Sequence, residues 1–306
     1  IFYSWGGGVM YDQARAGFLR DVSSVVPDSY LDTVSAAAAD AFTFEGQRVG
    51  LPLQVSQVAW WYNKDLMSQA GIDVSQIKMW DDLLDAVKQI KAAGITPICM
   101  GGKDKWPVHF VWTHLHIRNG GKGLFLESLN NGGWDRPEYI RSGEQMLELV
   151  ELEPFQKGWL AATWPDQAGF FGDGKCAMAF MGNWMYGAQA SNSASGEGLA
   201  DANMGMFNMP MTSGGIGDSG DTLGGINGWL FSSTASDAAV ELMMHYVSLD
   251  IQKEDASNGA YIPIVKGADG SLTNPFLQQV AKNISNSEYH QIFYDQFLGA
   301  DIGRVV

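Results

Sequence analysis

Between residues 49 and 100 the spacing of apolar positions changes from one period to another. Val49 to Tyr62 is mostly β-branched and aromatic, which predicts an extended strand with Pro52 near its start. A short helical pattern follows over residues 64–70, and apolar residues then recur at helical spacing from Asp81 until Gly94. Residues 95–100 are apolar again, so a strand, two helices and a second extended segment are expected here.

Strand-like and helical patterns alternate along the rest of the chain, which is typical of an α/β protein. Ile1 to Trp5 predicts a buried parallel strand, and the near-continuous apolar run from Lys175 to Met181 predicts a strand covered on both faces. Helical patterns occupy residues 137–152 and 235–249, and Trp229 to Ser232 is extended.

Several short phrases follow one another along the chain in a fixed order. They are Gly50-Leu51-Pro52, Trp61-Tyr62-Asn63-Lys64-Asp65-Leu66, Ala70-Gly71-Ile72-Asp73, Trp80-Asp81-Asp82-Leu83, Lys91-Ala92-Ala93-Gly94, Phe171-Gly172-Asp173-Gly174-Lys175-Cys176-Ala177-Met178, Gly182-Asn183-Trp184 and Gly224-Gly225. In this order and spacing they resemble the bacterial extracellular solute-binding protein family 1, the sugar-capturing components of ATP-driven importers, which are similar to maltose-binding protein. The resemblance covers nearly all of the 306 residues.

The resemblance implies a two-lobe periplasmic-binding-protein fold, type II-like, with a mixed sheet flanked by helices in each lobe. It implies a monomer that needs no cofactor, lies in the periplasm or on the cell surface as a lipoprotein, and delivers a mono- or oligosaccharide to the membrane permease of an ABC importer. It also implies that elements of the family before residue 1 and after Val306 are missing, so we expect an incomplete piece of a longer protein.

The length of 306 residues favours two lobes over a single core. The chain is expected to cross between them near residues 55–57, 221–225 and 262–266. Residues 1–56 and 222–264 would then form the N-terminal-type lobe, and residues 57–221 and 265–306 the C-terminal-type lobe. Three short connections allow closure of the interlobe cleft as a hinge.

Composition narrows the possible partners. The formal net charge of -15 opposes binding to nucleic acid and disfavours multiply anionic ligands. No run approaches the roughly 20 apolar residues of a membrane span. Cys99 and Cys176 lie far apart within apolar runs, so we expect two small buried side chains and not a disulfide.

A sugar site needs flat aromatic platforms and fixed polar groups. Several of the eleven tryptophans lie beside Gly or Asn, outside apolar helical stripes. The predicted platforms are Trp5, Trp61, Trp106, Trp184 and Trp229; Trp60 and Trp61 point to opposite faces of one strand, so one of them is expected in the core.

The polar candidates surround the expected crossings. They are Gly6, Ser56, Gln57, Asp221, Gly225 and Lys266, with Asp218 as an alternative to Asp221. Glycine backbone at Gly6 and Gly225 can approach another group closely.

The sequence shows no recognisable set of catalytic residues. His114 and His116 lie on different faces of one predicted helix, away from any metal-binding motif. Gly215-x-Gly217-x-x-Gly220 matches the dinucleotide fingerprint by letter, but it lacks the preceding strand and following helix, which leaves a flexible crossing as the simpler interpretation. A glycoside hydrolase is the alternative that stays open, because two distant carboxylates leave no local motif.

Overall fold

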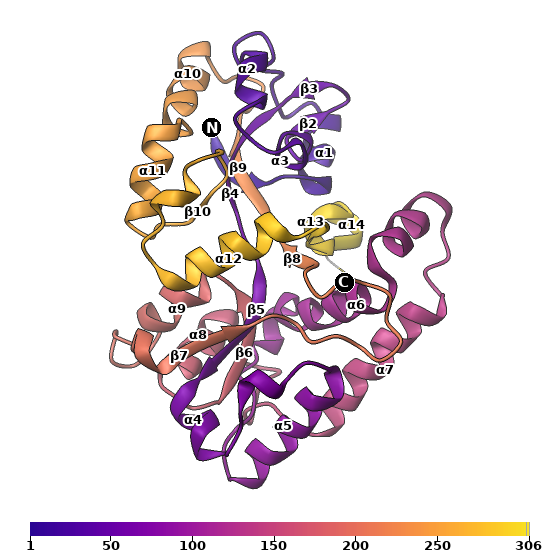
Figure 1. Ribbon diagram of the computed structural model, residues 1–306. Helices are drawn as coiled ribbons and strands as arrows, with labels where there is room; N and C mark the ends of the chain where they lie inside the picture. The colour runs from indigo at the N-terminus through magenta and orange to yellow at the C-terminus, as the bar shows by residue number, and fades with distance from the viewer. Residues whose placement is uncertain (304, 306) are drawn as a thin grey trace. The chain divides into compact units, whose positions relative to one another are not determined.

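The computed structural model describes residues 1–303 and 305, and these form two compact units (Figure 1). Unit 1 contains residues 1–57, 224–286 and the described residues from 292 onward; unit 2 contains residues 58–223 and 287–291. Each unit has its own sheet and its own helices, which confirms the α/β class.

Unit 1 is built on a four-stranded sheet in the order β1-β9-β4-β10. The strands are β1 Phe2–Trp5, β4 Gly50–Val55, β9 Ile226–Leu230 and β10 Ile262–Pro263. Leu51 and Leu230 are fully buried, and together with Phe42 and Phe231 they belong to the apolar core of the unit. Burial of these side chains is the main source of stability in the unit.

The prediction of a buried parallel strand at residues 1–5 is wrong in both respects. β1 pairs antiparallel with β9, and Phe2, Tyr3 and Trp5 are exposed. An apolar run fixes neither the direction of pairing nor the number of neighbours, and β1 is an edge strand with one neighbour. All strand pairs in the two main sheets are antiparallel, and parallel pairing in unit 2 is confined to single bridges such as Ile98 with Met178.

The remaining elements of unit 1 are short strands and helices around this sheet. They are α1 Gly8–Arg15, α2 Asp28–Leu31, α3 Ala36–Asp40, β2 Thr43–Phe44, β3 Gln47–Arg48, α10 Asp237–Tyr246, α11 Leu249–Ser257, α12 Pro275–Asn286, α13 Tyr294–Phe297 and α14 Ala300–Gly303.

Unit 2 has a three-stranded sheet in the order β6-β5-β7. The strands are β5 Val58–Asn63, β6 Met178–Gly182 and β7 Met204–Phe207. The helices are α4 Lys64–Gln69, α5 Trp80–Ala92, α6 Trp106–Asn131, α7 Pro137–Glu151, α8 Trp164–Gly172 and α9 Met185–Ser191. Every residue of β6 is buried, as its apolar run predicts.

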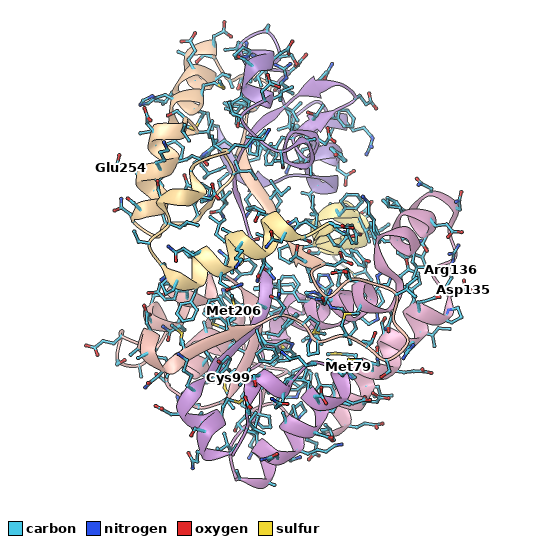
Figure 2. The ribbon with its side chains drawn as sticks, in the orientation of Figure 1. Met79, Cys99, Asp135, Arg136, Met206 and Glu254 are labelled. Atoms are coloured by element: carbon cyan, nitrogen blue, oxygen red, sulfur yellow. A yellow bond between two sulfur atoms is a disulfide. The ribbon has the colours of Figure 1, made fainter. Side chains whose placement is uncertain are left out.

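Cys99 and Cys176 form a disulfide, with their Cα atoms 5.6 Å apart (Figure 2). This corrects the expectation of two unpaired buried cysteines. The pairing arises because the segment at residues 98–99 lies beside the start of β6, where Cys99 N donates to Met178 O at 2.8 Å. Separation along the sequence gave no sign of this contact.

The expected lobe boundaries differ from the units at the C-terminal end. Residues 265–286 and the described residues from 292 onward group with unit 1, and residues 287–291 group with unit 2. After the changes at 57/58 and 223/224, the chain therefore changes unit at 286/287 and again at 291/292, and not at 262–266. Gln252 explains the difference, because its Oε1 accepts hydrogen bonds from Ile264 N and Val265 N and its Nε2 donates to Leu53 O, all within unit 1. The segments β8 Thr222–Gly224 and β11 His290–Ile292, where the chain changes unit, pair with each other.

Candidate functional site

Three half-buried tryptophans of unit 2 pack together through Trp106. Trp106 is central, with its ring centroid 5.6 Å from that of Trp164 and 6.4 Å from that of Trp184. The ring planes are inclined by 55° at both steps. We call these three residues the tryptophan row. Trp106 and Trp184 are among the predicted platforms, whereas Trp164 was missed.

Each member of the row stands where a loop enters a helix. Trp106 and Trp164 are the first residues of α6 and α8, each is followed by proline, and Trp184 precedes α9 directly. Proline suits the first helical turn because its missing N–H has no partner there. The repeated Trp-Pro pair at 106–107 and 164–165 is the sequence signal that could have identified Trp164 as well.

The row rests on buried side chains and fixed loops. The ring of Phe110, only 2% exposed, lies 5.2 Å from that of Trp106 and 6.4 Å from that of Trp184. Asp104 Oδ2 accepts a hydrogen bond from Trp164 N at 2.7 Å, and buried Gln167 accepts one from Gly101 N at 2.9 Å. The ring contacts of Phe110 and these two backbone hydrogen bonds support the segments that carry the three indoles.

Trp61 is wrong as a ligand platform. It is completely buried at the centre of the unit 2 sheet, and its Nε1 donates to Met181 O at 3.1 Å. Trp60 and Trp80 are buried as well, so both residues of the Trp60-Trp61 pair belong to the core. β5 is flanked by β6 and β7 and covered on both faces, which the alternation of side chains could not reveal.

In unit 1, Trp5 and Trp229 project from neighbouring strands. Trp5 is 45% exposed, whereas Trp229 is half-buried, with its ring edge-on to those of Tyr3 at 5.5 Å and Tyr246 at 5.8 Å. Nε1 of Trp229 is buried without a hydrogen-bond partner. Trp5 and Trp229 stay candidates within unit 1.

Ser56 and Gly225 bond to each other. Ser56 Oγ accepts from Gly225 N at 2.9 Å, and Ser56 N donates to Gly225 O at 2.9 Å. Ser56 is 6% exposed, so its polar groups serve the fold, and its expected role toward a ligand has no support here. Gln57 beside it is almost completely buried.

Gly6 and Lys266 also have partners within unit 1. A Cβ at Gly6 would lie 2.7 Å from Ala41 O, so close packing requires glycine there. Lys266 N donates to Thr33 O and its Nζ to Asp32 O at 2.9 Å. Lys266 therefore holds a loop of unit 1 instead of lying at a crossing.

Arg118 organises the glycine-rich segment at residues 212–221. It is fully buried, and its guanidinium donates to the carbonyls of Met209, Asp218, Ser219 and Asp221 at 2.7–3.2 Å. Burial lowers the pKa of Arg118 to about 10. The expected flexible crossing is therefore a loop fixed to α6.

Asp221 is part of the same arrangement. Its Oδ2 accepts from Asp218 N at 2.9 Å, and burial raises the pKa of its carboxyl. Asp218 Oδ1 in turn accepts from Gly220 N at 2.7 Å. Both carboxylates shape the loop, and neither expected ligand role is tested by these contacts.

The histidines of α6 are buried. His109, His114 and His116 have lowered pKa values, about 4 for His109 and about 3 for His116, because burial disfavours the charged ring. Among residues 1–303 and 305, no three His, Cys, Asp or Glu side chains gather as metal ligands.

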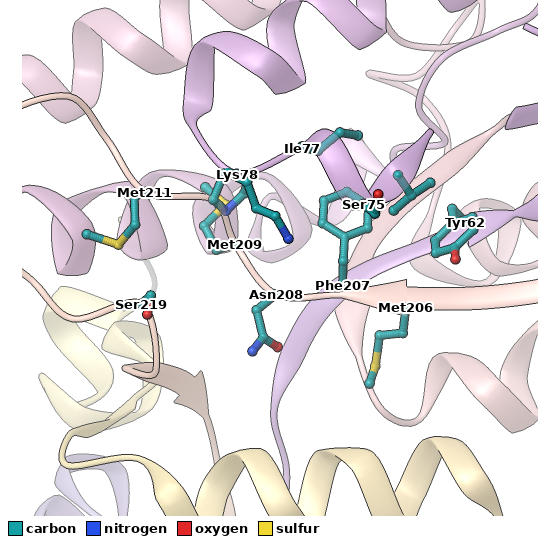
Figure 3. Close-up of a pocket in the computed structure, with 12 residues that line it drawn as sticks. Tyr62, Ser75, Ile77, Lys78, Met206, Phe207, Asn208, Met209, Met211 and Ser219 are labelled. Carbon is teal, nitrogen blue, oxygen red and sulfur yellow. The ribbon is translucent and has the colours of Figure 1, made fainter. Parts of the chain in front are cut away.

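A separate pocket of about 530 Å³ lies beside β7 in unit 2 (Figure 3). Its wall combines apolar side chains such as Phe207 and Met209 with the polar side chains of Lys78 and Asn208. No member of the tryptophan row lines it. The pocket and the row are therefore distinct features of unit 2.

Comparison with known proteins identifies the family. Residues 1–254 match the family model described as bacterial extracellular solute-binding protein. The chain belongs to this family. No helix within the described part of the chain has both the length and the apolar character needed to cross a bilayer.

Curated relatives include ABC transporter extracellular-binding proteins. An uncharacterized ABC transporter extracellular-binding protein of Pyrococcus horikoshii is 29% identical over 58% of this chain and 41% of its own length. The chain spans less than half the length of the first curated relatives it matches.

Solved structures share the fold over almost the whole chain. One from work on xylan utilisation by Caldanaerobius polysaccharolyticus is 24% identical, with a TM-score of 0.89 over 99% of this chain and 78% of the other. A chitin oligosaccharide binding protein is 25% identical, with a TM-score of 0.82 over 98% of this chain and 75% of the other. The two-lobe periplasmic-binding-protein fold is thereby confirmed.

Proposed function

We propose that this chain is the substrate-binding component of an ABC importer and that it captures a neutral carbohydrate without transforming it. Family membership supports a solute-binding role. The tryptophan row is the observation that supports a carbohydrate as the ligand. Trp106 and Trp184 are half-exposed. The other tryptophans of the same unit that lie in its core are buried, namely Trp60, Trp61 and Trp80. Likeness to a chitin oligosaccharide binding protein agrees with this choice.

The physical basis is stacking. The C–H face of a sugar ring packs on an indole, and its hydroxyls bond to fixed polar groups. Asp104 is positioned to bind a sugar hydroxyl. Its Oδ2 already accepts a hydrogen bond from Trp164 N, while its Oδ1 makes no hydrogen bond to the described residues. A carboxylate with a free oxygen accepts a sugar hydroxyl readily.

Thermal unfolding across a panel of neutral sugars tests the proposal. A ligand present at 100 times its dissociation constant adds about 2.7 kcal/mol of stability, which raises the melting temperature measurably. The panel contains glucose, xylose, N-acetylglucosamine and their β- or α-linked oligomers, with sn-glycerol 3-phosphate as an anionic polyol. Stabilisation by the anion alone would refute a neutral ligand.

Trp184→Ala is expected to weaken sugar binding by about 1–3 kcal/mol, by analogy with stacking losses on aromatic platforms. Calorimetric titration measures this, and an unchanged melting temperature of the free variant shows that the fold is intact. Equal affinity in the variant would mean that the platform has been wrongly chosen.

Chromatography of the sugar after incubation separates binding from catalysis. A binding protein returns its oligosaccharide intact, whereas a glycoside hydrolase releases new reducing ends. A protein that binds sugar and reports to a receptor instead of a permease would also return it intact, so reconstitution of uptake with the permease decides between those partners. The proposed location is the periplasm or the cell surface, where such a permease is reached.

Hinge closure stays a prediction. It is tested by small-angle scattering, where addition of the sugar identified above should reduce the radius of gyration.

A further inference from the structure

We infer that the pocket beside β7 is a second binding site in unit 2, for a small monocarboxylate with an aromatic or branched apolar body. This inference goes beyond the proposed function and is independent of it, because no member of the tryptophan row lines the pocket. Fixed walls, an apolar lining and one lysine carry it.

Two segments of unit 2 supply most of the lining. One is residues 74–78, which begin with the 3₁₀ helix η1 Val74–Gln76, and the other is residues 206–211, which begin in β7. Met211 N donates to Lys78 O at 3.0 Å, and Trp80 N donates to Met211 O at 2.7 Å. Since β7 is also paired with β5, backbone hydrogen bonds hold the second segment at both of its ends.

Arg118 fixes two further parts of the wall. Its buried guanidinium donates to Met209 O at 3.1–3.2 Å and to Ser219 O at 3.1 Å, and both Met209 and Ser219 line the pocket. The cavity of about 530 Å³ is therefore shaped by the fold itself. Small-molecule sites are usually preformed in this way and measure about 300–1,000 Å³.

The apolar part of the lining can adapt to a bulky group. Met206, Met209 and Met211 all line the pocket, together with Phe207. Phe207 is held by the stacked ring of Trp60, with the centroids 6.2 Å apart. Unbranched thioether side chains fit irregular shapes and make favourable contacts with aromatic rings. This lining favours an aromatic or branched apolar body over a sugar ring.

Lys78 gives the pocket its charge. Its side chain is exposed, and Figure 3 shows it running from the first segment toward the second. Within the described part of the chain, its ammonium group makes no hydrogen bond or ion pair. Asp73 and Asp82 lie on either side in sequence, but the carboxylate of Asp73 accepts from Ser75 N at 3.0 Å and that of Asp82 accepts from Lys78 N at 3.0 Å. Both carboxylates are therefore engaged by backbone N–H groups.

The sign and number of charges define the head group of the ligand. Among the described residues, the lining of this pocket contains one lysine and neither aspartate nor glutamate, although the whole chain has a net charge of -15. An ammonium group beside an apolar wall favours an anion and disfavours a cation. A second anionic group would have no cation to pair with, so a single carboxylate fits best.

The test uses protein labelled with ¹³C at the methionine methyl groups, which places reporters inside the pocket. Phenylpropionate, phenylpropanamide and phenylpropylamine share one apolar body and carry a negative, no and a positive charge. Phenylpropionate should shift the methyl signals of Met206, Met209 and Met211 in a saturable way, with each signal assigned by a Met→Leu variant. It should bind about fivefold more tightly than the amide, and the amine should bind most weakly.

Lys78→Met should remove the preference for the acid. Phenylpropionate should then bind about fivefold more weakly than to the wild type, at the affinity of the amide. Lys88→Met is the matched control, because Lys88 is an exposed lysine of the same unit that pairs with Asp85 on α5 and does not line the pocket. The preference for the acid should persist in this control.

Three results would each overturn the inference: unshifted signals of the three pocket methionines, equal binding of acid and amide by the wild type, or an undiminished preference for the acid in Lys78→Met. None of them bears on sugar binding at the tryptophan row, which the sugar panel measures separately. Failure of the second site and failure of the proposed function are therefore distinguishable.

Discussion

Trp61 and Trp184 carry the same side chain in the same unit, yet they differ in what surrounds them. Trp61 lies on the central strand, is fully buried and has its N–H bonded to Met181 O. Trp184 stands at the exit of β6 and remains half-exposed beside Trp106. At the scale of the residue, position within the unit decides whether an indole supports the fold or is available to a ligand.

Trp61→Phe should therefore lower stability and spare binding. The smaller ring leaves a cavity and an unpaired carbonyl, so the free energy of unfolding is expected to fall by about 1–3 kcal/mol. Urea denaturation measures the loss, and titration with sugar checks that affinity is unchanged. Trp184→Ala is the counterpart, with the opposite pattern expected; weaker binding by Trp61→Phe at undiminished stability would contradict this assignment.

At the scale of the element, the buried guanidinium of Arg118 holds the glycine-rich loop in place. Arg118 on α6 gathers carbonyls from residues 209–221, and Gly215 and Gly217 allow the loop backbone to lie against α6. Abundant glycine made flexibility the simpler interpretation, because nothing local shows that a distant arginine holds the segment.

Arg118→Met is expected to lower the free energy of unfolding by about 3 kcal/mol or more, since several buried carbonyls lose their donor. Urea denaturation provides the measurement, and limited proteolysis should show faster cleavage within residues 212–221. Arg136→Met is the control, because Arg136 pairs with Glu127 at an exposed position and its loss should leave the unfolding midpoint close to wild type. A protease-resistant loop in Arg118→Met would refute the role of the cation.

The disulfide also joins elements that are distant in sequence. Cys99 and Cys176 are separated by 77 residues, and a bridge across a loop of this size stabilises by roughly 2–4 kcal/mol. The double variant Cys99→Ala, Cys176→Ala should unfold at correspondingly lower urea concentration. Thiol titration of the unreduced, unfolded wild type is expected to find no free thiol, and two free thiols would show that the pair does not form.

At the scale of the whole molecule, buried histidines make stability depend on pH. His109 and His290 have pKa values lowered to about 4 and His116 to about 3, and that of His114 is lowered well below normal, in each case because burial disfavours the charged ring. The unfolded chain protonates these rings near pH 6.5. The contribution of these neutral rings to the free energy of unfolding is therefore fully present above pH 6.5. It is lost as the pH falls from there toward the lowered pKa values of the folded chain.

Two carboxyls, one buried and one partly buried, act in the opposite direction. Burial raises the pKa of Asp295 to about 6 and also raises that of Asp221, so the folded chain binds their protons first and gains stability as pH falls. Near pH 5 the four histidines of the unfolded chain bind about four more protons than those of the folded chain, and the two carboxyls offset at most about two of them. The free energy of unfolding should therefore fall by roughly 3 kcal/mol for each unit that the pH decreases near pH 5.

Urea denaturation between pH 7 and pH 4.5 measures this slope. His116→Phe should reduce it by about one proton, because the ring that the unfolded chain protonates is then absent. A slope near zero, or a free energy of unfolding that increases toward acid pH, would contradict the burial of neutral rings.

How far the sequence predicts the molecule varies from segment to segment. α5 and α7 follow from helical spacing, and β6 follows from its apolar run. Trp106 and Trp184 were predicted from their neighbours at the loop ends. Trp164 was missed although the same Trp-Pro pair begins its helix, and the hydrogen bonds of Ser56 to Gly225 could not be foreseen because the two residues are distant in sequence.

The sequence by itself determined the family, the α/β class and the positions of several helices and strands, because spacing of apolar residues and turn residues acts within a few neighbours. The tertiary structure decided which cysteines pair, which indoles remain exposed, how β1 pairs and which polar groups hold loops. Each of those outcomes depends on contact between segments far apart in the chain, and local spacing carries no record of such contact.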